Sequence, residues 1–228
     1  MDFNEISCIE EKHIFSGMRV NGTSIIPVTW TFTIEITPIS HPEQGKINKS
    51  VIAYEKVKFW IENVLEDLIV AIQDSDIGVN LAYGTDNPTL LTPYVPTDNH
   101  LVHIIHAKLN AIGGEELYIG LTTLSSSETM HTCKFNTLTG NYNLPEGDNY
   151  IEDMYHDTPW WHRPSFDFAD FTANEVEGDP ELQAFLSAED PIVEFEHSLI
   201  KAYDDHTDKK PEKAEIIKMP KKWSPKII

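Results

Sequence analysis

Cysteine is scarce in this sequence, and long apolar runs are missing. Among 228 residues there are two cysteines, Cys8 and Cys133, which is too few for a disulfide framework or a zinc ribbon. We therefore expect reduced thiols and a cytoplasmic protein. No apolar run approaches the ~20 residues that span a bilayer, so no membrane partner is expected. The first residues also lack the basic and apolar regions of a secretory signal.

Basic residues are few and unevenly placed. The chain has 17 Lys and Arg against 37 Asp and Glu, a formal net charge of −20. Because phosphate contacts require cations, this charge argues against duplex nucleic acid as a partner. Residues 1–200 hold 9 basic and 32 acidic groups, whereas residues 201–228 hold eight lysines and five acids. We predict that residues 201–228 form a basic tail, which is either solvated or docked on the acidic body or a neighbouring subunit.

The strongest secondary-structure signal is an alternating pattern in residues 26–37. Its apolar members are Val28, Trp30, Phe32, Ile34 and Ile36. Threonines and a glutamate fill the intervening positions, so the pattern predicts a strand with one buried face. Residues 13–20 predict a preceding strand, and Asn21-Gly22 predicts a hairpin turn between the two.

Two helices are predicted after this hairpin. Residues 54–72 have apolar side chains at steps of three and four, which is the helical period. Asp98 is expected to cap a second helix that ends at Gly113-Gly114. Residues 73–96, rich in Asp, Asn, Gly, Thr and Pro, are interpreted as a long loop. Two more strands are predicted at residues 115–124 and 129–137.

The predicted order, β-β-α-α-β-β, indicates an α+β domain over residues 1–137, with an antiparallel sheet and two helices on one face. Residues 138–200 are interpreted as an irregular, aromatic-rich extension that packs on this domain. Its segment 158–168 has two adjacent tryptophans between prolines, which do not suit a helix interior. Either this segment covers a face or edge of the sheet, or it is an aromatic platform for a protein partner or flat ligand. The residues of such a platform would be Trp160, Trp161, Arg163 and Phe166.

Five short motifs follow one another in residues 13–137. They are Phe15-Ser16-Gly17-Met18-Arg19, Val28-Thr29-Trp30 with the alternating strand, Val51 to Lys58, Pro96-Thr97-Asp98-Asn99-His100-Leu101, and Thr122-Thr123. In order and spacing they resemble motifs of the 6-pyruvoyl-tetrahydropterin synthase and 6-carboxytetrahydropterin synthase family. The resemblance implies the tunnelling fold, whose subunits close a barrel together, and hence a homo-oligomer. An open sheet would otherwise expose its edges.

The resemblance also implies a zinc-dependent reaction, whose residues are absent here. Where the family has three zinc-binding histidines, this chain has Arg19, Val28 and Trp30, none of which replaces an imidazole. Three further family residues are replaced as well. The base cysteine corresponds to Ser24, the relay histidine to Val70, and the glutamate that anchors the pterin or purine ring to Thr122.

Other residues are candidates for a rebuilt site. Cys133 and His131 share one side of a strand and are candidates for a nucleophile and its base, although a small buried thiol is the simpler interpretation. Glu128 is a candidate for the missing anchor. His103 and His106 lie three apart on the second helix and are either weak metal candidates or surface or interface histidines. The sequence places no third metal ligand beside them.

These observations favour a non-catalytic, divergent relative of the pterin synthases that acts as an oligomeric binding or structural assembly protein without a cofactor. A bound purine- or pterin-like molecule would be contacted by Arg19, Trp30, Thr122, Thr123 and Glu128. One alternative is a divergent enzyme that acts on a pterin, purine nucleotide or deazapurine precursor through a rebuilt site. Another is an unrelated α+β interaction protein.

Overall fold

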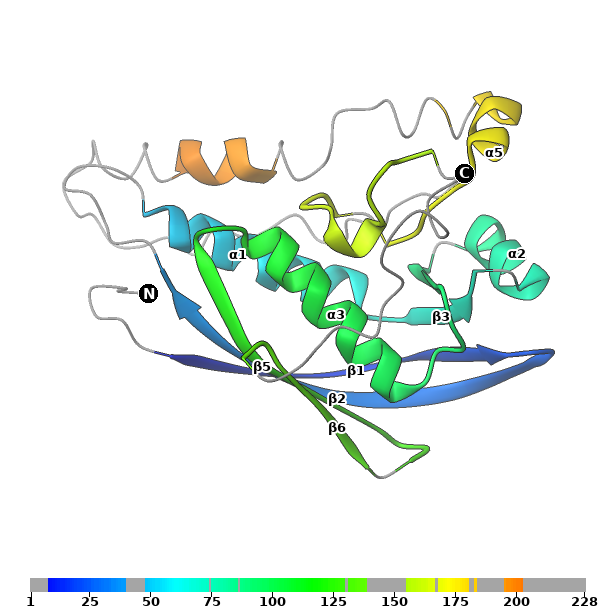
Figure 1. The fold of residues 1–228 in the computed structure, drawn as a ribbon, viewed down its shortest axis with the longest axis horizontal. Helices are drawn as coiled ribbons and strands as arrows, with labels where there is room; N and C mark the ends of the chain where they lie inside the picture. Colours follow the sequence, from blue (N-terminus) through cyan, green and yellow to red (C-terminus); the bar gives the residue numbers. More distant parts are fainter. Residues whose placement is uncertain are drawn as a thin grey trace.

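A six-stranded mixed sheet in the order β4-β3-β1-β2-β5-β6 organises the computed structural model (Figure 1). The structure describes residues 8–39, 48–73, 75–85, 87–129, 131–138, 155–166, 168–180, 183 and 195–202. The fold is α+β, as predicted. The basic tail from residue 203 onward lies outside the described residues.

The predicted hairpin is confirmed. Strand β1 (Ile9–Asn21) pairs antiparallel along its whole length with β2 (Ser24–Pro38), and the turn between them places Gly22 at a φ of 58°. The alternating apolar side chains of β2 are buried, as their period of two requires.

The predicted helix over residues 54–72 is wrong at its end. Helix α1 (Lys49–Val64) stops three residues before a strand, β3 (Leu68–Ile72), which runs parallel to β1. Asp67 adopts a φ of 55°, which breaks the helical path. The sequence of β3 is a short apolar run, and its periodicity does not distinguish a buried strand from a buried helical turn.

The predicted loop over residues 73–96 is also wrong. It contains helix α2 (Asp76–Gly84) and strand β4 (Thr89–Thr92), which pairs parallel to β3. The expected four-stranded antiparallel sheet is therefore a six-stranded mixed one. Ser75 caps α2 by accepting from the Gly78 backbone N–H at 3.1 Å, so part of the polar composition that indicated a loop forms a helix start.

The second half of the domain agrees with the prediction. Helix α3 (Asp98–Gly113) ends at Gly114, whose φ is 55°, and strands β5 (Leu117–Ser126) and β6 (Thr132–Asn136) extend the sheet antiparallel beside β2. Figure 1 shows α1 and α3 on the same face of the sheet, with the single-turn helix η1 (Trp160–His162) and α5 (Ala173–Gly178) on that side too. The hydrophobic core lies between the sheet and these helices.

The segment around η1 covers the β4 edge of the sheet. The Leu91 backbone N–H donates to the Phe168 carbonyl at 3.4 Å, and Trp160 Nε1–H donates to the Leu91 carbonyl at 3.1 Å. Lys108 of α3 is fully buried and donates to the carbonyls of Trp160 and Arg163 at 2.8 and 3.0 Å. The interpretation that this segment covers a sheet edge is therefore confirmed. Within the described part of the chain, no helix combines the length and apolar character needed to cross a membrane.

Gly17 tests the contact between β1 and β3. A Cβ at this position would lie 2.0 Å from the Leu68 carbonyl oxygen, so Gly17→Ala must push the two strands apart. We expect a loss of about 2 kcal/mol in the free energy of unfolding, measured by denaturant titration. Gly84→Ala is the control, because nothing lies within 4 Å of its Cβ, and it should change stability by less than about 0.5 kcal/mol. Equal effects of the two variants would contradict the parallel pairing.

Candidate functional site

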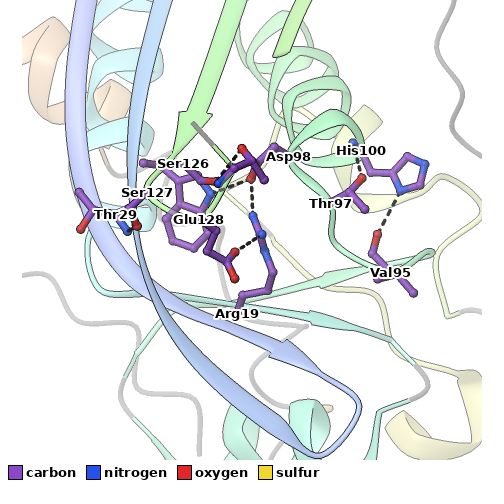
Figure 2. Close-up of polar contacts among 11 residues, drawn as sticks. Arg19, Thr29, Val95, Thr97, Asp98, His100, Ser126, Ser127 and Glu128 are labelled. Carbon is purple, nitrogen blue, oxygen red and sulfur yellow. Dashed lines mark hydrogen bonds and ion pairs between the residues drawn. The ribbon is translucent and has the colours of Figure 1, made fainter. Parts of the chain in front are cut away.

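A buried ion network joins three elements at the start of α3 (Figure 2). Arg19 lies on β1, Asp98 in the first turn of α3, and Glu128 in the turn after β5. One terminal nitrogen of the guanidinium donates to Asp98 and the other donates to Glu128. Because a guanidinium presents several donors in one plane, a single side chain holds both carboxylates.

The Asp98 carboxylate is saturated with donors. Oδ1 accepts from Arg19 and, at 3.3 Å, from Trp30 Nε1–H. Oδ2 accepts from the hydroxyls of Ser126 at 2.6 Å and Thr129 at 2.8 Å. Burial opposes the ionisation of Asp98, but the two hydroxyl donors and the Arg19 guanidinium outweigh it and lower the pKa of this carboxyl group. Asp98 is thus a fixed anion at neutral pH and does not act as a base.

Local sequence explains why Asp98 is available for this network. The N-cap of α3 is Thr97, whose hydroxyl accepts from the His100 backbone N–H at 3.3 Å, and not Asp98 as predicted. The turn that carries Glu128 is held against β2 by two bonds between Thr29 and Ser127, of 2.9 and 3.1 Å. The Glu128 side chain is 26% exposed, whereas those of Arg19 and Asp98 are almost completely buried.

Three of the five predicted ligand contacts come together here. Arg19, Trp30 and Glu128 meet at Asp98, with the guanidinium carbon 5.6 Å from the centre of the Trp30 ring. Thr122 and Thr123 do not join them, because neighbouring residues of β5 face opposite sides of the sheet and Thr122 is buried under α3. The structure adds Asp98, Ser126 and Thr129, which sequence reasoning missed. For Asp98, the sequence did contain a signal. Only one residue of the pair Thr97-Asp98 can cap the helix, so the side chain of the other is left for a different contact.

His106 fills a closed polar site between α3 and the sheet. Its Nδ1 lies 2.6 Å from the Thr122 hydroxyl and its Nε2 lies 2.6 Å from the Thr137 hydroxyl. Thr137 donates its own proton to the Ile119 carbonyl at 2.8 Å, so it must accept from Nε2–H, and Nδ1 accepts from Thr122. Burial, with a smaller contribution from His103, lowers the pKa of His106 to about 4.

His103 and His106 of α3 are core residues. His103, 6% exposed, packs edge-on against Phe135, so neither it nor His106 is a surface histidine. Within the described residues, no group of three or more His, Cys, Asp or Glu side chains could hold a metal ion. The zinc that the resemblance implies does not fit its expected position either. Arg19 and Trp30 both act there as hydrogen-bond donors to Asp98, and Val28 offers no ligand atom.

The remaining candidates are Cys133 and His131. Cys133 is half-buried on β6, and burial, followed by the negative charge of Asp98, raises the pKa of its thiol and so disfavours the nucleophilic thiolate. His131 is exposed.

The aromatic segment forms no exposed platform. Trp160 and Trp161 are completely buried, and Phe166 stacks on Phe59 of α1 with ring centres 5.1 Å apart. Arg163 forms an ion pair with Asp170 at 2.8 Å and serves the fold of its own segment. No protein-family model matches the sequence, and no curated protein is similar to it.

The network predicts unequal costs for removing its two carboxylates. Asp98→Ala leaves the buried guanidinium short of its main partner and should cost about 3–5 kcal/mol of unfolding free energy. Glu128→Ala removes a partly exposed partner and should cost about 1 kcal/mol. Glu62→Ala breaks an exposed pair with Lys58 and is the control, with a cost below about 0.5 kcal/mol. Denaturant titration measures all three, and a cost for Glu128→Ala at or above that of Asp98→Ala would contradict the assignment of Asp98 as the centre.

His106 predicts a pH dependence of stability. Its pKa is about 4 in the folded protein and 6.5 in the reference state, so the unfolded chain binds a proton in this interval that the folded chain does not. The free energy of unfolding should therefore fall as the pH is lowered from about 6.5 to 4, by about 3 kcal/mol from this residue. His106→Gln should reduce this slope, and the same replacement at exposed His197 should not. Unchanged slopes in both variants would refute the assignment.

Proposed function

We propose that this chain is a non-catalytic, divergent relative of the pterin synthases that acts as an oligomeric binding or structural assembly protein. One observation carries the proposal. Where the resemblance implies metal ligands, Arg19 and Trp30 are bound to a buried carboxylate, and each charged group of the network holds another. Such a network stabilises a scaffold but leaves no poised base, nucleophile or metal ligand among its members.

The alternative of a divergent enzyme finds less support. It relies on Cys133 as nucleophile and Glu128 as substrate anchor. The raised pKa of the Cys133 thiol disfavours the thiolate, and Arg19 already occupies the Glu128 carboxylate. A purine- or pterin-like molecule or a protein partner is therefore proposed as something that is bound and not converted.

The strand edges favour assembly with further copies of the chain. Within the described residues, β1 pairs with β2 along its whole length, but on its other side β3 reaches only Gly17 to Arg19. No described residue pairs with residues 9–16 on that side, and in the described part of the chain β6 is paired only with β5. Free edges of this length recruit another strand unless they are blocked. We propose that the β1 and β6 edges pair between subunits.

Native mass spectrometry with elemental analysis tests this function. We expect a closed ring of subunits without stoichiometric zinc. A stoichiometric metal would overturn the non-catalytic assignment, and a monomer would overturn the assembly.

A pair of proline variants then tests the edge itself. Successive residues of β1 point their N–H groups alternately toward β2 and toward the free edge. Of Lys12→Pro and His13→Pro, one therefore breaks the hairpin and the other blocks only the edge. The variant that keeps its unfolding midpoint should be monomeric. If it still forms the ring, the free edge of β1 is not the interface.

A further inference from the structure

A shallow apolar depression lies at the carboxyl ends of the parallel strands β3 and β4. Its volume is about 550 Å³, and it is lined by Ile72, Pro93, Tyr94, Val95 and His100. Tyr94 and Val95 remain 41% and 50% exposed, so two adjacent large side chains of this connection face solvent. The depression is separate from the Arg19 network, whose members do not line it.

Prolines and hydrogen bonds constrain the loop that forms the depression. Prolines stand at both ends of Tyr94-Val95, and the Tyr94 carbonyl accepts from the Thr92 hydroxyl at 2.7 Å. The Val95 carbonyl accepts from the Thr97 backbone N–H at 2.7 Å and from His100 Nδ1–H at 3.0 Å. Because the loop is already fixed, an incoming group would lose little binding energy to ordering it.

In the neutral His100 ring, Nε2 offers the depression one hydrogen-bond acceptor. A carbonyl can only accept, so the bond to Val95 requires the proton on His100 Nδ1 and leaves Nε2 as an acceptor in the neutral ring. Figure 2 shows this imidazole projecting away from α3 above Val95. The Tyr94 ring lies 5.3 Å from it, centre to centre. Two rings, aliphatic neighbours and one acceptor suit a flat apolar group with one N–H donor, which describes an indole.

The chain itself carries an indole that the described structure does not use. Four of its five tryptophans, Trp30, Trp60, Trp160 and Trp161, are completely buried. The fifth, Trp223, lies 21 residues beyond Ala202, where the described chain ends over α1. Treated as a random coil, a segment of 21 residues has a root-mean-square span of about 25 Å, which corresponds to an effective concentration in the millimolar range for a contact within one chain.

Charge favours the same pairing. Residues 216–228 contain four lysines and no acidic residue, whereas residues 1–200 contain 32 acidic and 9 basic groups. Asp76, exposed in the first turn of α2, lies four residues after Ile72, and no described lysine or arginine lines the depression. We propose that the C-terminal tail of the same chain docks on this surface, with the Trp223 indole in the depression and its N–H donating to His100 Nε2.

Fluorine NMR of the full chain labelled with 5-fluorotryptophan tests the docking. Trp223→Phe assigns the Trp223 resonance, and a labelled peptide of residues 216–228 gives its position when free. We expect a resonance displaced from the free position in the native chain. Tyr94→Ala should shift the ratio of docked to free tail toward the free state by about tenfold, because it removes the main ring contact. Tyr155→Ala removes a tyrosine of the same 41% exposure elsewhere and should leave the ratio unchanged.

His100→Phe keeps a ring but removes the acceptor, and it should also weaken docking. A Trp223 resonance at the free-peptide position in the native chain would overturn the proposal, as would a displaced resonance that Tyr94→Ala leaves in place. If the displacement of the Trp223 resonance disappears on dilution together with subunit dissociation, the depression binds the tail of a second copy. That result would overturn docking within one chain. Saturating free indole provides a direct competitor and should release Trp223.

Discussion

The burial of one positive charge, on Arg19, constrains the arrangement of the whole domain. Removing a guanidinium from water costs several kcal/mol unless carboxylates neutralise it at close range. The two that do so come from the start of α3 and from the turn after β5, residues far apart in the chain. The network is therefore complete only when the hairpin, the helix and the turn after β5 are all in their final positions. A slip of one residue in β1 would turn Arg19 to the opposite face and leave Asp98 buried without its cation.

Helix α3 is the element on which the other layers depend. Asp98 binds the sheet from the first turn of the helix. His106, at its middle, binds β5 and the residue that follows β6, and Lys108 binds the segment around η1. Each contact satisfies a buried polar group, so each is costly to leave incomplete. Apolar packing would tolerate small shifts of the helix, but these directional bonds fix its register. The segment around η1 is thus part of the same packed unit as the sheet, although it lies far along the chain.

The same saturation bears on function. Catalytic groups commonly have a pKa shifted toward their reaction, such as a carboxylate with a raised pKa, or they are nucleophiles activated by a neighbouring base. Asp98 has a lowered pKa, the Cys133 thiol has a raised one, and His106 is enclosed by two hydroxyls. These are the properties of side chains that stabilise a fold. Among the described residues, the strand edges and the exposed loop at Tyr94 and Val95 are the surfaces on which the proposed interactions rest.

Local sequence by itself determined the β1–β2 hairpin, the amphipathic body of α1 and the carboxyl end of α3, because alternation, helical period and terminal glycines act over a few residues. It did not determine β3 and β4, because the short apolar run of β3 becomes a strand only beside its parallel partner β1, and that of β4 only beside β3. It named Arg19, Trp30 and Glu128, but only the tertiary structure brought them to Asp98, since ion pairing over a separation of 79 residues leaves no local pattern. Likewise, the paired tryptophans marked an important segment, and burial against α3 and β4 decided that its role is packing.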